Sequence, residues 1–192
     1  MKIAVVDNKD SFTYNLVHYL EQYADSVNVF RYNLINVSDL EYFDRIVISP
    51  GPGLPSDYPI IRQILDVFHD SKPILGICLG HQAIFEYFGG NLINLESPCH
   101  GLDMKTKVID KNELLFRDVP PVFSSGRYHS WIADEKTIPD SINVTAVDDT
   151  FGYIMALSHR KFNIRGMQFH PESVMTGYGM KMIENWVKSV RL

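Results

Sequence analysis

The stretch Ile74-Leu75-Gly76-Ile77-Cys78-Leu79-Gly80 determines the fold that we expect for this chain. It predicts a short buried strand that turns directly into a helix, and this helix is expected to end at Gly89-Gly90. A sharp turn of this kind crowds the backbone, so glycine is required on either side of the residue at the corner. The Cys78 side chain is therefore expected at the carboxyl end of the strand, where open α/β sheets bind their ligands.

The chain before this stretch alternates in the same way. Ser11 is predicted to cap the first helix. Strand–helix alternation with nearly continuous apolar strands predicts a parallel sheet that is covered by helices on both faces. The expected strands lie at residues 3–6, 27–30 and 46–48, and the expected helices at 12–23 and 61–68.

The second half of the chain shows a different pattern. Short strand candidates at 105–109, 142–147 and 154–157 are separated by turn residues, and they predict antiparallel strands added to one edge of the parallel core. A further strand is expected at 165–169, and a closing helix is expected from Ile183, Trp186, Val187 and Val190. We therefore expect one three-layer α/β domain over residues 1–192, with a mostly parallel central sheet, helices on both faces and additional antiparallel strands.

The composition limits the classes of function. The 192 residues include 18 Lys and Arg against 23 Asp and Glu, and the net charge of −5 offers no electrostatic footprint for nucleic acid or an anionic membrane. No apolar run approaches the roughly 20 residues of a membrane-spanning helix. The chain begins with a strand-like run that lacks the layout of a signal peptide, so the cytoplasm is the expected location. Its two cysteines, Cys78 and Cys99, are too few for a disulfide framework.

Cys78 stands in a Gly-x-Cys-x-Gly pattern, which is typical of a nucleophile at a strand-to-helix turn. The backbone N–H of Leu79 opens the helix and could face a developing oxyanion. The positive end of the helix dipole also favours the thiolate form of a cysteine at this position. The alternative is a small buried apolar residue at the end of a strand, which is the commonest role of a lone cysteine.

His170 is the candidate base among seven histidines, because Phe169-His170-Pro171-Glu172 ends an apolar strand. Residues two apart in an extended segment point to the same side, so Glu172 could bind one imidazole nitrogen while the other faces Cys78. The alternative is a turn with a fortuitous salt bridge. Pro50-Gly51-Pro52-Gly53 is equally ambiguous: it either connects two elements or aims the N–H groups of Gly51 and Gly53 at a substrate carbonyl.

Taken together, these motifs resemble the class I (triad) glutamine amidotransferase family over essentially the whole chain. In family order they are Pro50-Gly51-Pro52-Gly53, Gly76-Ile77-Cys78-Leu79-Gly80-His81-Gln82 and His170-Pro171-Glu172-Ser173. The segment from Asp7 to Asn15 and the run Arg127-Tyr128-His129-Ser130 resemble the subgroup of anthranilate synthase component II and the glutaminase component of aminodeoxychorismate synthase. Trp131 stands where many members carry leucine, and Thr176-Gly177-Tyr178-Gly179 replaces the usual Thr-Pro-x-Gly.

The resemblance implies the role of each site residue. Cys78 is the expected nucleophile, His170 the general base and then acid, and Glu172 the group that orients the imidazole. The backbone N–H groups of Gly53 and Leu79 are expected to form the oxyanion hole. The residues expected to line the glutamine pocket are Gly51, Gly53, Gln82, Ser130 and Trp131.

The resemblance also implies the partners. L-glutamine is the expected substrate, and ammonia is expected to pass directly into a chorismate-using synthase subunit, in tryptophan or folate biosynthesis. No metal or cofactor is expected in this chain, whereas chorismate and Mg²⁺ belong to the synthase. The residues expected at the partner interface are Asn8, Asp10, Ser11, Phe12 and Tyr14.

Two other functions compete with this interpretation. One is a cysteine peptidase or γ-glutamyl hydrolase with the same turn, and the other is a catalytically silent interaction module that keeps the fold. Gln82 after Gly80-His81, together with the N-terminal segment, favours the amidotransferase over the hydrolase. All three triad residue types are present, which argues against the silent module. Cys99 is interpreted as a bystander.

Overall fold

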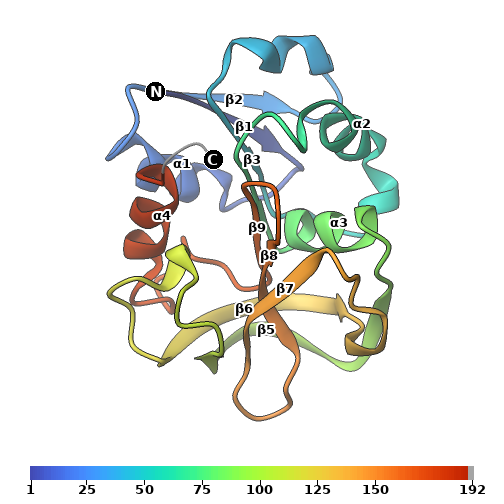
Figure 1. Cartoon of the computed structure of the whole chain (residues 1–192), viewed down its shortest axis with the longest axis vertical. Helices are drawn as coiled ribbons and strands as arrows, with labels where there is room; N and C mark the ends of the chain where they lie inside the picture. The colour runs from blue at the N-terminus through green and yellow to red at the C-terminus, as the bar shows by residue number, and fades with distance from the viewer. Residues whose placement is uncertain (190–192) are drawn as a thin grey trace.

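The computed structural model describes residues 1–189, and within them a single nine-stranded sheet runs through the molecule (Figure 1). The strand order is β2-β1-β3-β4-β9-β8-β7-β5-β6. The first five strands in this order pair in parallel, and the pairs from β9 to β6 are antiparallel. The strands are β1 (Lys2–Asp7), β2 (Ser26–Arg31), β3 (Arg45–Ile48), β4 (Ile74–Ile77), β5 (Leu92–Val108), β6 (Val122–Ala133), β7 (Ile142–Asp148), β8 (Ile154–His159) and β9 (Ile164–Met167).

Helices cover both faces of the parallel half (Figure 1). On one face lie α1 (Thr13–Glu21) and α4 (Gly179–Val187), and on the other lie α2 (Pro59–Phe68) and α3 (Leu79–Tyr87). No helix of the described chain is long and apolar enough to cross a membrane. Four short 3-10 turns complete the described elements: η1 (Val37–Tyr42), η2 (Pro55–Asp57), η3 (Leu114–Phe116) and η4 (Glu135–Thr137).

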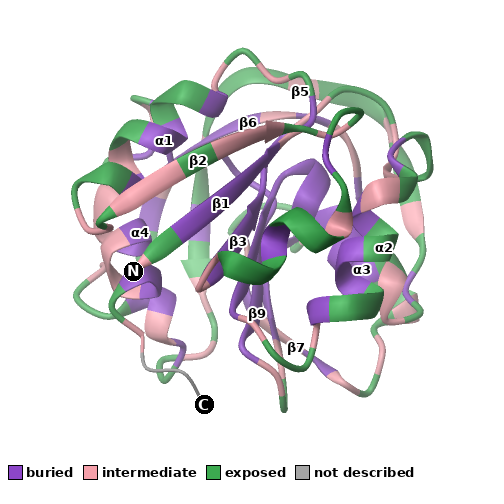
Figure 2. Ribbon diagram, turned by 90° about the horizontal axis from the view of Figure 1, so that it is seen from above, coloured by how far each residue is buried: buried purple, intermediate pink, exposed green. Residues whose placement is uncertain are grey.

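The two apolar cores follow from the alternation of side chains along each central strand. In β1, Ile3 and Val5 pack in the core of α1 and α4, whereas Ala4 and Val6 pack in the core of α2 and α3. All four are fully buried, and Figure 2 shows the central strands buried along most of their length. This explains why the parallel strands are continuous apolar runs, and it confirms the predicted parallel sheet with helices on both faces.

The predicted antiparallel strands at one edge are also confirmed, but this part of the sheet is larger than expected. The strand β6 was not predicted, and β5 begins at Leu92 rather than near residue 105. Polar residues interrupt both strands, and β5 changes register between Asn94 and Cys99 and again between His100 and Leu102. Such bulges remove the regular alternation that identifies a strand from its sequence. Val190 lies outside the described residues.

The prediction that Ser11 caps the first helix is wrong. The helix α1 begins at Thr13, and its N-cap residue is Phe12, which makes no side-chain cap. Two aspartates hold this turn instead: Asp10 accepts a hydrogen bond from the Phe12 N–H at 3.0 Å, and Asp7 accepts one from the Thr13 hydroxyl at 3.0 Å.

The parallel strands place the candidate residues at one edge of the sheet. The carboxyl ends of β1, β3, β4 and β9 all point the same way, because these strands are parallel neighbours. The segments that leave them are residues 8–12, 49–53, 78–80 and 168–172, which include most of the predicted site residues. A candidate site is therefore expected where these four segments meet.

Candidate active site

The turn after β4 has the strained geometry that its glycines predict. Cys78 has φ 50° and ψ −98°, a combination that costs a non-glycine residue about 1–3 kcal/mol. A Cβ on Gly76 would lie 2.4 Å from the carbonyl group of Gly80, and one on Gly80 would lie 2.5 Å from the carbonyl oxygen of Ile48. Neither backbone can yield, so both positions require glycine. The predicted strand-to-helix corner is present, with Cys78 at the start of α3.

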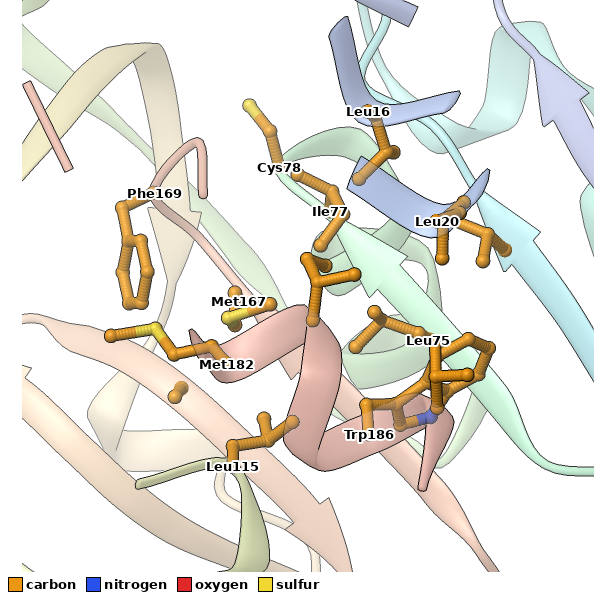
Figure 3. Close-up of a cluster of buried hydrophobic side chains, with 14 of the residues drawn as sticks. Leu16, Leu20, Leu75, Ile77, Cys78, Leu115, Met167, Phe169, Met182 and Trp186 are labelled. Carbon is orange, nitrogen blue, oxygen red and sulfur yellow. The ribbon is translucent and has the colours of Figure 1, made fainter. Parts of the chain in front are cut away.

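Cys78 lies at the border of the apolar core. Its N–H donates to the carbonyl of Met167 at 2.8 Å, which ties the corner to the neighbouring strand β9. Figure 3 shows its sulfur pointing away from the core side chains, such as Leu75 and Trp186. The residue is only 5% exposed. The thiol is thus held at the edge of the sheet, largely shielded from water.

His170 and Glu172 form a buried pair beside this thiol. Nδ1 of His170 lies 2.7 Å from Oε1 of Glu172, and both side chains are buried. Nε2 of His170 is buried without a hydrogen bond of ordinary length, and the Cys78 thiol interacts with the same ring. Burial opposes the charged form of the ring, but the Cys78 thiol and the Glu172 carboxylate outweigh it and raise the pKa of His170 well above its usual value. The imidazole is therefore poised to hold a proton between a thiol and a carboxylate.

Two backbone contacts fix the position of His170. Its N–H donates to the carbonyl of Gly126 at 3.1 Å, and its carbonyl accepts a hydrogen bond from the Thr176 hydroxyl at 2.6 Å. The Thr176 hydroxyl in turn accepts from the N–H of Gly126 at 3.0 Å. The strand β6, which the sequence did not reveal, thus holds the histidine in place.

Two aromatic rings cover the imidazole. Tyr128 of β6 lies with its ring 4.9 Å from that of His170, and Phe12 lies 6.3 Å from it. The two rings also touch each other, with centroids 5.6 Å apart. This cover accounts for the 3% exposure of His170.

The N-terminal loop predicted at a partner interface lies against this site. Burial raises the pKa of Asp10, while the charge of His170 opposes that rise and Glu172 adds to it. Tyr14 is 63% exposed, as a surface residue should be. Asn8 differs from the prediction, because it is fully buried and its amide donates to the carbonyl of Ser49 at 3.0 Å. It joins the ends of β1 and β3, and its side chain cannot meet a partner.

The glycine-rich turn after β3 packs directly on the corner. A Cβ on Gly51 would lie 2.6 Å from the carbonyl oxygen of Asn8 and 2.8 Å from Cδ2 of Leu79. Gly53 has φ +77°, a conformation that favours glycine. The structure thus brings the turn to the first residue of α3, next to the predicted oxyanion hole. That the N–H groups of Gly53 and Leu79 form an oxyanion hole remains a prediction.

Three predicted pocket residues lie close together at the start of α3 and the end of β6. Nε2 of Gln82 donates to the carbonyl of Trp131 at 2.8 Å and to Oε1 of Gln168 at 3.1 Å. Both amide hydrogens are therefore used, which leaves Oε1 as the atom that Gln82 can offer a substrate. Ser130 is the half-buried neighbour of Trp131 on the same strand.

Gln168 is a site residue that the sequence analysis missed. It is fully buried, and its Nε2 donates to the Cys78 sulfur at 3.6 Å. The signal was available, because Gln168 precedes His170 by two residues, just as Glu172 follows it by two. Within residues 1–189, no group of three or more His, Cys, Asp or Glu side chains could hold a metal ion.

Comparison with known proteins places this site in a family. The model of the family "Glutamine amidotransferase class-I" matches residues 4–190. The chain belongs to the class-I glutamine amidotransferases. The corner at Cys78 and the pair after β9 are thus features of a member of this enzyme family.

Several relatives share nearly the whole length of this amidotransferase chain. Anthranilate synthase component 2 of Lactococcus lactis is 42% identical over 98% of this chain and 94% of its own. The aminodeoxychorismate/anthranilate synthase component 2 of Bacillus subtilis is 38% identical over 98% and 97%. The crystal structure of a "putative gmp synthase subunit a protein" from Thermoplasma acidophilum superposes with a TM-score of 0.87 at 26% identity, over 97% of this chain and 92% of that one.

Proposed function

We propose that this chain is the glutaminase subunit of a chorismate-using synthase, which hydrolyses L-glutamine and delivers the ammonia to its partner. The family match and the component 2 names of its full-length relatives support this assignment. The observation that carries it is the buried imidazole of His170, which interacts with the Cys78 thiol and hydrogen-bonds Glu172. We expect the complex to act in the cytoplasm.

The proposed reaction begins with His170 holding the proton of the Cys78 thiol. The thiolate attacks the side-chain carboxamide carbon of glutamine, and the carbonyl oxygen becomes an oxyanion. We assign the binding of that oxyanion to the N–H groups of Gly53 and Leu79. The His170 proton passes to the leaving nitrogen, so ammonia departs and a thioester remains.

Hydrolysis completes the cycle with the same residues. His170, now neutral, takes a proton from water, and the resulting hydroxide attacks the thioester carbon. The carbon–sulfur bond breaks, glutamate leaves, and the proton on His170 again faces the Cys78 thiolate. Glu172 stabilises the imidazolium in both halves of the cycle and fixes the ring. The steps assigned to this chain use its own side chains, and we assign chorismate and Mg²⁺ to the synthase.

The partner surface follows from the loop that touches the site. Asp10 and Phe12 lie against His170, and Tyr14 is exposed beside them, so a synthase bound here would receive ammonia close to where it forms. Direct transfer matters because ammonia released into water at neutral pH is protonated and no longer nucleophilic. We propose Asp10, Ser11, Phe12 and Tyr14 as partner contacts.

The test uses the complex of this chain with its synthase, and the variant Cys78→Ala. We expect the variant to form no product from chorismate and glutamine, and to form it normally from chorismate and an ammonium salt. Loss of the ammonium-dependent reaction would refute the division of labour. The product made from chorismate distinguishes the two synthases, since one makes anthranilate and the other aminodeoxychorismate.

Two controls separate this proposal from its competitors. If the unmodified chain cleaves γ-glutamyl peptides and ignores glutamine, it is a hydrolase. If a glutamine-like alkylating analogue labels neither cysteine in the complex, it is a silent module. We expect stoichiometric labelling of Cys78, with Cys99 spared.

A further inference from the structure

A row of buried amides leads from the backbone of β6 to the sulfur of Cys78. Gln82 donates from Nε2 to the carbonyl of Trp131 at 2.8 Å, and the same nitrogen lies 3.1 Å from Oε1 of Gln168. Nε2 of Gln168 lies 3.6 Å from Sγ of Cys78. These contacts join three separate elements at the reacting atom.

The direction of every amide in this row is fixed by its first member. A backbone carbonyl only accepts hydrogen bonds, so Gln82 must turn its NH₂ group toward Trp131. That same NH₂ group also faces the side chain of Gln168, whose oxygen must therefore be the acceptor of the hydrogen bond. The NH₂ group of Gln168 is consequently forced toward the Cys78 sulfur. A glutamine side chain by itself could point either its oxygen or its NH₂ group toward the sulfur, and here the carbonyl of Trp131 fixes the orientation.

The row of amides lies in a buried region, where a hydrogen bond is stronger than it is in water. Gln168 is fully buried, Gln82 is 3% exposed and Cys78 is 5% exposed, so water competes poorly for these groups. The backbone is fixed as well: the Gln168 N–H donates to Met155 of β8 at 2.8 Å, and the Cys78 N–H donates to Met167 of β9 at 2.8 Å. Donor and sulfur are thus carried by neighbouring strands rather than by mobile loops.

We propose that Gln168 donates a hydrogen bond to the Cys78 thiolate, and that Gln82 locks the Gln168 amide in the donating orientation. The pair then stabilises the nucleophile before glutamine arrives, because a hydrogen bond to the charged form favours that form. This inference rests on the proposed function, in which Cys78 is the nucleophile. It gives Gln82 a task in addition to its predicted place in the glutamine pocket.

Other titratable groups near Cys78 must be separated from this effect. Cys78 and Glu172 raise the pKa of His170, and Asp10 interacts with the charge of the same ring. Burial lowers the pKa of His81 to about 4, and burial together with the charge of Arg127 lowers the pKa of His129 to about 3. These two histidines are therefore neutral between pH 5 and 9, where they add no titration of their own.

The experiment measures alkylation of Cys78 by iodoacetamide as a function of pH, on the full chain without glutamine, with each cysteine quantified by mass spectrometry. In Gln168→Met, which keeps the length of the side chain and removes the donor, we expect the pH of half-maximal rate to rise by about one unit. Gln168→Glu keeps the shape and places a carboxylate oxygen at the sulfur, so its rise should be larger. If Gln168 merely fills space, the midpoint of folded Gln168→Met should equal that of the unmodified chain.

The role of Gln82 is tested by non-additivity. Gln82→Met frees the Gln168 amide to turn, so its midpoint should also rise, by less than that of Gln168→Met. The double variant should match Gln168→Met alone, because Gln82 acts only through Gln168. A double variant that adds the two single shifts would refute the locking role.

Two controls are built into the chain. The alkylation profile of Cys99 should be the same in every variant, since Cys99 does not contact the row. Gln63→Met removes an exposed glutamine of α2 and should leave the Cys78 profile unchanged. Thermal unfolding checks that each variant is folded. If Gln168→Met is not folded, Gln82→Met decides the question, because an unchanged midpoint in that variant would refute the proposal.

Failure of this inference can be distinguished from failure of the proposed function. Alkylation needs neither glutamine nor the synthase, so the midpoints can be measured even if the complex releases no ammonia. If the complex hydrolyses glutamine and the midpoint of folded Gln168→Met equals that of the unmodified chain, the amide row has no role in poising the thiolate. If the midpoints shift as expected and no glutaminase is found, the row is correct and the function is wrong.

Discussion

Replacing Glu172, the carboxylate that holds the imidazole of His170, should shift the alkaline limb of the pH–activity profile. In Glu172→Gln the side chain keeps its size, and its carbonyl oxygen can still accept from Nδ1 of His170. The negative charge is lost, and with it the charge-assisted part of a buried hydrogen bond that measures 2.7 Å. A hydrogen bond to a charged group contributes about 1.5–3 kcal/mol and a neutral one about 0.5–1.5 kcal/mol, so the loss is about 1–1.5 kcal/mol, or roughly 5- to 10-fold in the catalytic rate.

The assay is glutamate release by the complex between pH 6 and 10. In the proposed mechanism the protonated ring of His170 delivers the proton to the leaving nitrogen, so we expect activity to fall where the ring loses that proton. Without the carboxylate charge the ring loses it sooner, and we expect the alkaline limb to move down by about one pH unit. An alkaline limb that stays in place in a folded variant would show that Glu172 does not support the charge of His170.

The same substitution has a stability effect with a defined sign. Because the pKa of His170 is raised in the folded state, its contribution to stability is fully present below its ordinary value of 6.5 and is lost as the pH rises through the folded value. The difference in unfolding free energy between the unmodified chain and Glu172→Gln should therefore be larger at pH 6 than at strongly alkaline pH. Urea titrations at both pH values measure it.

Two further substitutions test the turn at Cys78 and the aromatic ring of Phe12 that covers His170. Gly80→Ala places a methyl group 2.5 Å from the carbonyl oxygen of Ile48, so we expect urea titrations to show an unfolding free energy lower by about 1–3 kcal/mol. The control Gly177→Ala meets nothing within 4 Å, and its unfolding free energy should stay within about 0.5 kcal/mol of that of the unmodified chain. Equal effects would remove the steric argument for the corner. Phe12→Ala uncovers the imidazole and should speed iodoacetamide labelling of Cys78 at fixed pH, while an unchanged labelling rate would mean that Phe12 does not limit access to the thiol.

The parallel half of the fold and the corner at Cys78 could be predicted because their causes are local. Both faces of the central parallel strands β1, β3, β4 and β9 are buried, so their apolar runs are visible in the sequence. The crowding at Gly76 and Gly80 is a property of the turn itself. A turn motif and the alternation of an extended segment make Cys78, His170 and Glu172 candidates, and the resemblance to a known family assigns their roles.

The strand β6 could not be predicted, because what stabilises it is distant in the sequence. Arg127 is 1% exposed in the middle of this strand, which is unusual for a charged residue. It is buried because its guanidinium lies 3.3 Å from the carboxylate of Asp148 on β7 and 2.7 Å from the hydroxyl of Thr106 on β5. Burial lowers its pKa to about 10, which still leaves it charged at neutral pH. The residues next to Arg127 in the sequence do not indicate that Asp148 and Thr106 are its partners.

The segment after β9 links the candidate site to the apolar core of α1 and α4. Phe169 packs in the apolar core (Figure 3), with its ring 5.6 Å from that of Phe123. Its neighbours Gln168 and His170 both interact with the Cys78 thiol. Because side chains alternate, the same backbone that anchors Phe169 sets the positions of both polar groups. A close-packed core resists small displacements, so it holds Gln168 and His170 at fixed distances from the Cys78 thiol. A cavity at Phe169 should therefore loosen both of these neighbours at once.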